Sequence, residues 1–231
     1  MKNIAVRFFV LFCLSLCAVS QNAFADDKVV MGYFSTDSQE NFEKKIKPLF
    51  DEFKGSCKNC EIVNLTPYDE KGVYSKKDVL EKLKSPTPDV SFYFFSWNEK
   101  ATDQNKDLVT ALGEKSDASK LVISPTGQAH DGESGLPLSR TVMGQAKDVV
   151  ILGEITERDR LLPQSYFGPE MLTAIRPPKE YIGQGMGAFY FASRLTAAWN
   201  RRKPAEWLQH FKTKKMKSRK IWLETEDLLG R

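Results

Sequence analysis

Short apolar runs alternate with helix-like segments along most of this chain, and this alternation constrains the fold more than any other feature. The strand-like runs are 29–34, 61–65, 90–97, 120–124 and 148–153. The helix-like segments are 42–53, 75–83, 106–113, 185–199 and 204–211. Strands joined through helices run parallel, and the helices cover both faces of the sheet. We therefore expect a single α/β domain, a three-layer sandwich with a mostly parallel central sheet and helices on both faces.

The first residues have the three parts of a signal peptide. Lys2 and Arg7 precede an apolar run, 8–19, and Ala23-Phe24-Ala25 offers the small residues that suit cleavage. The apolar run is shorter than the roughly 20 residues needed to span a bilayer. We expect residues 1–25 to be removed and residues 26–231 to form the domain. The mature protein is then periplasmic or secreted and has no membrane span.

The charge of the chain is nearly balanced once the signal peptide is gone. Its removal takes away Lys2 and Arg7 and lowers the formal net charge from +4 to +2. Basic residues nevertheless gather at 201–220, where nine Lys or Arg accompany one acid, Glu206. Such a segment attracts anionic polymers, or it is simply a solvated tail. No aromatic stacking pattern is interleaved with it, so nucleic acid is not an expected partner.

The predicted mature chain contains two cysteines, Cys57 and Cys60, and they lie between a predicted helix and a predicted strand. In an oxidising compartment such a pair forms a local disulfide. A redox-active pair typically sits where a strand runs into a helix, which is the reverse order. A zinc site needs two further ligands, and His130 and His210 are distant, unpatterned candidates. We expect a structural disulfide, no metal site and no cofactor, with the redox and zinc alternatives less favoured.

Several segments, taken in order, resemble the subtilisin family of serine proteases (subtilases). The most specific one is a strand followed by a turn, 149–154 through 165–170, which is similar to the family's run ending in Ser-Asn-x-Gly-Pro. The resemblance covers most of the mature chain and implies a subtilisin-like fold and serine endopeptidase chemistry. The matching segments are 60–80, 89–98, 120–128, 149–170, 174–178 and 187–196.

The positions that carry catalysis in that family hold other residues here. In the ungapped match, Phe189 replaces the nucleophilic serine, Ser35 the aspartate and Gln128 the oxyanion-hole asparagine. The family's histidine precedes the oxyanion asparagine, yet no histidine occurs before His130. Phe189 has no attacking atom, and the extra methylene of Gln128 displaces its amide. The sequence therefore predicts a pseudoprotease rather than a peptidase.

Nearby residues offer only partial replacements for the catalytic groups. Asp37 lies two residues after Ser35, and Glu40 or Glu43 could act as a base, as a glutamate does in the related sedolisin branch. Ser193 is the hydroxyl nearest to Phe189, but four residues along a helix place it about 6 Å away. We expect Ser193 to be structural.

Three functions remain open from the sequence. The first is a non-catalytic module that binds an extended peptide or a protein beside the 90–97 strand, with Phe92, Tyr93, Phe94 and Ser96 as groove residues or, alternatively, ordinary sheet core. The second is a serine hydrolase that uses Ser193 or the glycine-rich loop 127–135, which holds His130 with Asp131, Glu133 and Ser134. The third is an envelope protein that binds anionic polymers through its basic segment.

Overall fold

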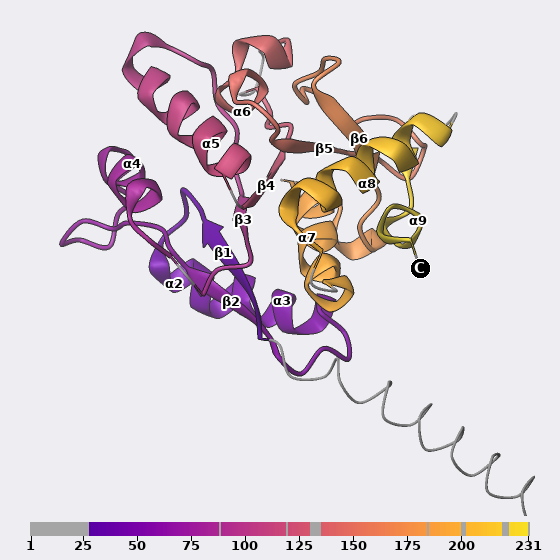
Figure 1. Ribbon diagram of the computed structural model, residues 1–231, viewed down its shortest axis with the longest axis horizontal. Helices are drawn as coiled ribbons and strands as arrows, with labels where there is room; N and C mark the ends of the chain where they lie inside the picture. Colours follow the sequence, from indigo (N-terminus) through magenta and orange to yellow (C-terminus); the bar gives the residue numbers. More distant parts are fainter. Residues whose placement is uncertain are drawn as a thin grey trace, which may run out of the picture.

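A computed structural model describes seven ranges of the chain: 28–87, 89–118, 120–129, 135–183, 185–199, 202–218 and 222–230. The predicted signal peptide and His130 to Ser134 lie outside these ranges. Figure 1 shows a central sheet with helices on either side, and the chain's last helix lies beside the two long helices that precede it. None of the helices in these ranges is long and apolar enough to cross a membrane.

Within the described ranges the sheet has seven strands in the order β2-β1-β3-β4-β5-β6-β7, and every neighbouring pair is parallel. The predicted α/β sandwich is therefore correct. The strands are β1 (Val29–Phe34), β2 (Cys60–Asn64), β3 (Phe92–Phe95), β4 (Leu121–Pro125), β5 (Val150–Glu154), β6 (Met171–Ile175) and β7 (Trp222–Leu223).

Helical segments connect these strands and complete the chain. They are α2 (Gln39–Asn41), a π-helical turn (Phe42–Ile46), α3 (Lys47–Phe53), α4 (Lys76–Lys84), α5 (Lys106–Ala118), α6 (Val142–Gln145), α7 (Met186–Ala198), α8 (Pro204–Lys217) and α9 (Thr225–Leu229), with single 3₁₀ turns at Asp103–Asn105, Leu138–Arg140 and Lys179–Tyr181.

Two hydrophobic cores lie on opposite faces of the sheet, and strand β1 shows how the sequence divides between them. Met31 and Tyr33 point into one core with α3, α7, α8 and α9, whereas Val30 and Phe34 point into the other with α4, α5 and α6. Successive residues of a strand face opposite sides, so a run that is apolar throughout is buried on both. The continuous aromatic run of β3 is explained in the same way, because β3 pairs with β1 on one side and with β4 on the other.

The element boundaries differ from the predicted ones in several places. The first helical segment begins earlier, because Ser38 accepts the backbone N–H of Asn41 and caps α2. Helix α8 continues to Lys217, and β3 is shorter than the predicted 90–97 strand. Strands β6 and β7 were not predicted: β6 contains a central threonine, and β7 has two residues, too few to leave a periodic pattern.

Candidate functional site

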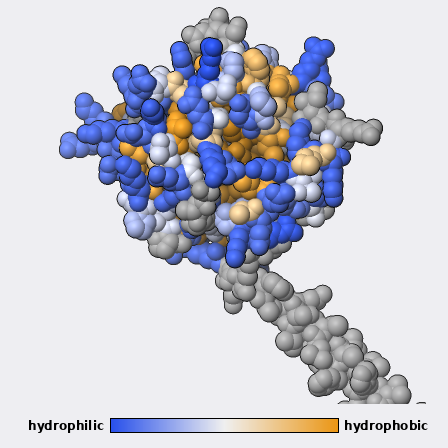
Figure 2. All heavy atoms as spheres, turned by 45° about the horizontal axis from the view of Figure 1, so that its top comes forward, coloured by the Kyte–Doolittle hydropathy of each residue, from blue (hydrophilic) through white to orange (hydrophobic). Residues whose placement is uncertain are grey.

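The carboxyl ends of parallel strands lie at one edge of a sheet, and in this protein they open onto a cleft. Two adjoining cavities of about 310 Å³ and about 370 Å³ occupy it. Both are lined by Thr36, Ser96 and Gly185, so they form one recess, here called the strand-end cleft. In Figure 2, the top of Figure 1 is turned forward, and hydrophobic side chains are visible in a central area surrounded by hydrophilic ones.

The two cavities differ in the elements that line them. The smaller one, called the loop cavity, is also lined by Trp97, Asn98, Pro125, Thr126, Gly127, Gln128, Leu152, Glu154, Leu162 and Ser165. The larger one, called the helix cavity, is also lined by Tyr33, Asp37, Asn41, Lys45, Ile46, Leu49, Phe94, Met186 and Phe189. An apolar recess with a few convergent polar groups is the usual form of a ligand site in α/β proteins.

Hydroxyl groups that follow β1 and β3 meet between the two cavities. Ser96 Oγ donates to Ser35 Oγ at 3.0 Å, and Ser35 Oγ donates to Asp37 Oδ2 at 3.1 Å. The phenol of Tyr33 bonds the same two serines, and burial raises its pKa to about 12. Ser35, predicted to replace the family's aspartate, thus has a carboxylate beside it. This set contains hydroxyl groups and one exposed carboxylate, and within the described ranges no imidazole lies beside it to take a proton from a serine.

Phe189 lies in the first turns of α7 and forms part of the apolar floor of the helix cavity. It is 3% exposed, and its ring centroid lies 5.6 Å from that of Phe94 and 6.0 Å from that of Tyr33. Ser193 is fully buried one turn further on, and its Oγ donates to the Phe189 carbonyl oxygen at 2.9 Å. Ser193 lines neither cavity. Its hydroxyl hydrogen therefore bonds within the helix.

Glu154 ends strand β5 with a buried carboxylate that faces the start of α7. The backbone N–H of Gly187 donates to one of its oxygens at 3.0 Å, and the N–H of Gly183 donates to the other. Burial raises the pKa of the Glu154 carboxyl, and the N–H groups of the 183–187 segment counteract part of this rise. The glycines permit the approach, because a Cβ on Gly187 would lie 3.1 Å from Glu154 Cγ and 2.9 Å from the Ile175 oxygen.

Gln128, predicted to replace the oxyanion-hole asparagine, lies where β4 leads into the loop cavity. Its backbone forms an antiparallel bridge with Ser165. On either side of it, the Tyr166 N–H donates to the Gly127 oxygen at 3.1 Å and the Ala129 N–H to the Gln164 oxygen at 3.0 Å. The backbone of Gln128 is thus fixed by these bonds, and Gln128 is exposed and lines the cavity.

The predicted peptide groove along β3 requires correction. Phe92 and Tyr93 are 0% and 1% exposed and line neither cavity, because β3 lies inside the sheet rather than at its edge. These two residues belong to the ordinary sheet core, which was the alternative interpretation. Phe94 and Ser96 do line the cleft, and the recess therefore lies beyond the end of β3.

The remaining site predictions fall away from the cleft. His210 lies in α8 and contacts α9, where its Nε2 is 3.1 Å from the Leu228 carbonyl oxygen, and burial lowers its pKa. Among the described residues, no group of three or more His, Cys, Asp or Glu is placed to hold a metal ion. Residues 204–217 of the basic segment form helix α8, and Lys212 in this helix pairs with Asp148 at 3.0 Å.

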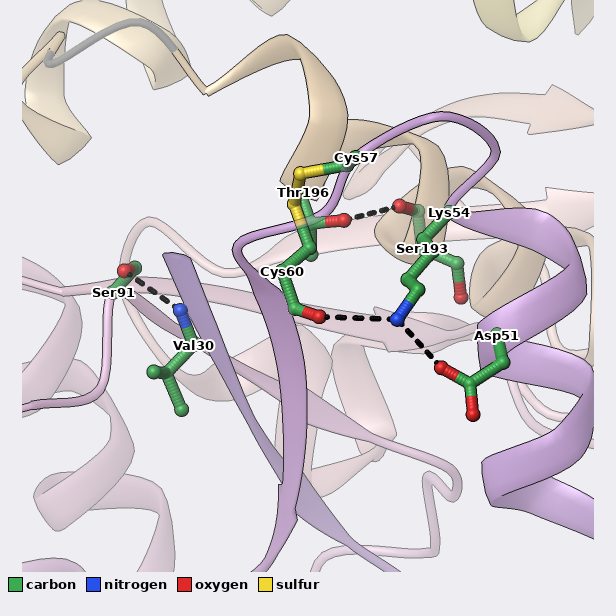
Figure 3. The surroundings of a disulfide bond; sticks show 8 residues. All are labelled: Val30, Asp51, Lys54, Cys57, Cys60, Ser91, Ser193 and Thr196. Atoms are coloured by element: carbon green, nitrogen blue, oxygen red, sulfur yellow. Dashed lines mark hydrogen bonds and ion pairs between the residues drawn. A yellow bond between two sulfur atoms is a disulfide. The ribbon is translucent and has the colours of Figure 1, made fainter. Parts of the chain in front are cut away.

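A disulfide joins Cys57 to Cys60 and closes the turn between α3 and β2, as the order of these elements predicted. Figure 3 shows it beside Ser193 and Thr196 of α7. Lys54, at the end of α3, adds a second tie: its Nζ donates to the Cys60 oxygen at 3.4 Å and pairs with Asp51 at 2.6 Å. The disulfide lies in the scaffold and not in the cleft, which favours the structural interpretation.

Glu154 is the cleft residue that sequence reasoning missed. A signal for it exists: one acid ends an otherwise apolar strand, and three glycines recur at alternate positions, 183, 185 and 187, before a helix. Recognising from the sequence that Glu154 contacts these glycines requires knowing that β5 ends beside the start of α7. That neighbourhood is set by the order of strands in the sheet.

Comparison with known proteins shows the fold of this chain. No known family model matches the sequence, and no curated protein matches it. Its structure is similar to a cold-adapted subtilisin-like serine proteinase, with a TM-score of 0.58, 14% identity and 84% of each chain covered.

Two peptide-processing enzymes are also similar in structure. One is a lanthipeptide protease, with a TM-score of 0.63, 12% identity and 92% of this chain and 90% of that one covered. The other is the prenylagaramide maturation protease PagA, with a TM-score of 0.54, 12% identity and 93% and 98% covered. The chain therefore has the subtilisin-like fold that the sequence resemblance implied, and at these identities the likeness concerns the fold alone.

Proposed function

We propose that this protein is an exported, subtilisin-like pseudoprotease that binds an extended peptide or protein segment in the strand-end cleft without cleaving it. The observation that carries the proposal is the cleft's composition. A serine hydrolase needs a nucleophile beside a base. The open recess at the carboxyl ends of the strands has Phe189 in its lining and the mutually bonded hydroxyls of Ser35 and Ser96 beside it, and among the described residues it has no imidazole.

Peptides are the ligand class that the cleft and the structural neighbours together favour. The loop and helix cavities adjoin, and both are lined by apolar side chains together with short polar ones, which suit a peptide's side chains and backbone. Two of the structural neighbours are described as a lanthipeptide protease and a maturation protease, and these names indicate that those two proteins act on peptides. A fold does not fix a function, and the proposal therefore needs a direct binding test.

Peptide binding is tested with the purified protein and an immobilised library of extended peptides, followed by fluorescence polarisation of the enriched sequences. Thr36 is exposed and lines both cavities, so Thr36→Trp places a large ring in the cleft. We expect saturable binding that Thr36→Trp abolishes. Thr110→Trp, at an exposed position of α5 outside the cleft, is the matched control and keeps binding.

The non-catalytic part of the proposal is tested on the same samples. We expect the enriched peptides to be recovered intact by mass spectrometry and a fluorophosphonate probe to leave the protein unlabelled. Labelling that disappears in Ser96→Ala or Ser35→Ala would instead identify a serine hydrolase. Failure of every peptide to saturate would remove the binding function.

Export is proposed from the sequence of the first 25 residues. Expression of the full chain followed by fractionation should yield a mature form outside the cytoplasm that begins at Asp26. Recovery of the uncleaved chain in the cytoplasm would contradict export.

A further inference from the structure

We propose that the last turns of helix α8 dock on the surface of an anionic lipid bilayer, and that this contact turns the strand-end cleft away from the membrane. The docking surface, here called the lysine face, consists of Lys212, Lys215, Met216 and Lys217. The proposal concerns a part of the molecule outside the cleft, so it goes beyond peptide binding and does not depend on it.

Helix α8 packs one side on the core and turns a basic side to solvent. Trp207 and Phe211 are 1% and 0% exposed, whereas Lys212 and Met216, four residues apart on a different face, are exposed. From residue 209 to 217 the helix has four lysines and neither Asp nor Glu. Because Lys212 pairs with Asp148, this stretch keeps a formal net charge of +3, four lysines less one aspartate. Such a charge attracts an anionic surface.

Met216 points to a lipid surface rather than to a soluble polyanion. Lysines at the end of a helix have an ordinary explanation, since they stabilise the negative end of the helix dipole. Helix α4 is an example: Lys82 and Lys84 lie in its last turn, and Leu83 between them is 2% exposed. Met216 also lies between two lysines, yet it is 83% exposed. An apolar side chain among lysines suits the boundary between headgroups and acyl chains, whereas a dissolved polyanion offers it no apolar phase.

Helix α8 lies at the amino ends of the strands, opposite the cleft. Trp199 stacks on Phe92, the first residue of β3, at 5.2 Å and on Trp207 of α8 at 5.9 Å. Further along α8, Lys212 reaches Asp148, which lies two residues before β5. The cleft lies at the carboxyl ends of the same parallel strands. A bilayer in contact with the lysine face therefore leaves the cleft open on the far side.

The binding experiment uses sedimentation with vesicles of phosphatidylcholine, either alone or mixed with an equal amount of phosphatidylglycerol. Residues 1–25 are omitted, because their apolar run binds lipid by itself, and every residue of the described fold is retained. We expect the protein to bind the anionic vesicles and not the neutral ones. Binding should weaken as the salt concentration rises, because salt screens exposed charges.

The charge of the lysine face is tested with the triple variant Lys212→Gln, Lys215→Gln and Lys217→Gln. One lysine near an anionic surface contributes about fivefold to binding, so the triple variant should bind the anionic vesicles about a hundredfold more weakly. Circular dichroism checks that the variant folds.

The matched control removes the same charge from α4, where the apolar residue between the lysines is buried. It is the triple variant Lys77→Gln, Lys82→Gln and Lys84→Gln, three exposed positions of that helix. This variant should keep the native affinity for anionic vesicles. An equal loss in both triple variants would show that only the overall charge matters, and the inference would be wrong.

The orientation is tested with a polarity-sensitive fluorophore attached to a single new cysteine. Met216→Cys places it on the lysine face, and Thr36→Cys places it in the cleft; both positions are exposed. On anionic vesicles the emission at position 216 should shift to shorter wavelength, while that at position 36 stays unchanged. Because Met216 makes little contact with the core, this measurement decides the question even if the lysine triple variant does not fold.

The remaining outcomes separate lipid from other ligands and this inference from the proposed function. Equal binding to neutral and anionic vesicles, or a spectral shift at position 36, would overturn the inference. So would binding of DNA or polyphosphate through the lysine face by a protein that leaves anionic vesicles unbound. Failure of every peptide to bind would remove the peptide function and leave the lipid contact standing, since the two surfaces are tested separately.

Discussion

At the scale of single residues, burial has opposite energetic effects on two side chains of the cleft, Phe189 and Glu154. Phe189 contributes a ring to the core and forms the cleft floor, so its contribution to stability comes from packing. Glu154 is ionisable and buried, so the same removal from water that favours Phe189 disfavours the ionised form of Glu154 and raises its pKa. The two residues therefore respond differently to mutation and to pH.

The pH dependence of stability should contain a contribution from Glu154. Its folded-state pKa is raised above the ordinary value of 4.5, so the folded state binds the proton more tightly than the unfolded state does. The free energy of unfolding from this group is therefore largest at low pH and falls as the pH rises from about 4.5 through the folded-state pKa. Urea unfolding of the native protein and Glu154→Gln at a series of pH values should show this decline in the native protein and its absence in the variant. Equal pH slopes in both would contradict the burial argument, and Glu81→Gln should keep the native slope.

Removing the ring of Phe189 should destabilise the fold rather than create activity. The ring contacts Tyr33, Phe53 and Phe94, and a Phe→Ala change at a buried site costs about 3–5 kcal/mol. Urea unfolding of Phe189→Ala measures the loss. Phe167→Ala is the matched control: this ring is 53% exposed, so its removal should change stability by about 0.5 kcal/mol or less. A small effect at Phe189 would mean that the floor of the helix cavity can collapse around the missing ring.

At the scale of elements, sequence patterns predict the strands and helices that bury continuous apolar surface. Strands β1, β3, β4 and β5 were predicted because each is a short apolar run, and the alternation with helices indicated that they are parallel. Strand β7 has two residues and joins the sheet only because β6 offers an edge, which is a tertiary effect that no local pattern records. The placement of β3 inside the sheet also decided that Phe92 and Tyr93 belong to the core.

The turn between α3 and β2 should depend on its disulfide for part of its stability. Cys57 and Cys60 are three residues apart, so the crosslink closes a short loop, and the chain-entropy model predicts a loss of about 2 kcal/mol when it is broken. Cys57→Ala is the suitable variant, because Cys60 is buried and remains as a small apolar side chain. Thermal unfolding of the variant should match that of the native protein in reductant. A melting temperature that reductant does not change would show that the Lys54 contacts alone hold the turn.

At the scale of the whole molecule, the order of the strands brings distant residues into one cleft. Ser35, Ser96 and Glu154 follow or end three different strands, and Gly185 precedes α7, yet all lie at the same edge because the strands are parallel. Sequence analysis could predict that edge as the site, but not which side chains meet there. The contact between Glu154 and Gly187 spans 33 residues, and it depends on β5 lying next to the start of α7.

The C-terminal residues also contact distant parts of the chain, because they cover the core on the side of α7 and α8. Leu223, Leu228 and Leu229 are 7%, 0% and 5% exposed. Two nitrogen atoms of Arg194 in α7 also bond to Glu226, at 3.0 and 2.8 Å. Truncation after residue 218 exposes the apolar surface that these leucines cover.

Burial of one leucine stabilises a fold by about 1.5–3 kcal/mol, so three approach the 5–15 kcal/mol that holds a whole domain together. The truncated protein should therefore lose its cooperative thermal transition in calorimetry. Leu228→Ala, which costs about 2–5 kcal/mol, should instead melt cooperatively at a lower temperature. A cooperative transition in the truncated protein at the native melting temperature would contradict this prediction. It would show that strands β1 to β6 and α7 fold as a unit that β7 and α9 do not stabilise.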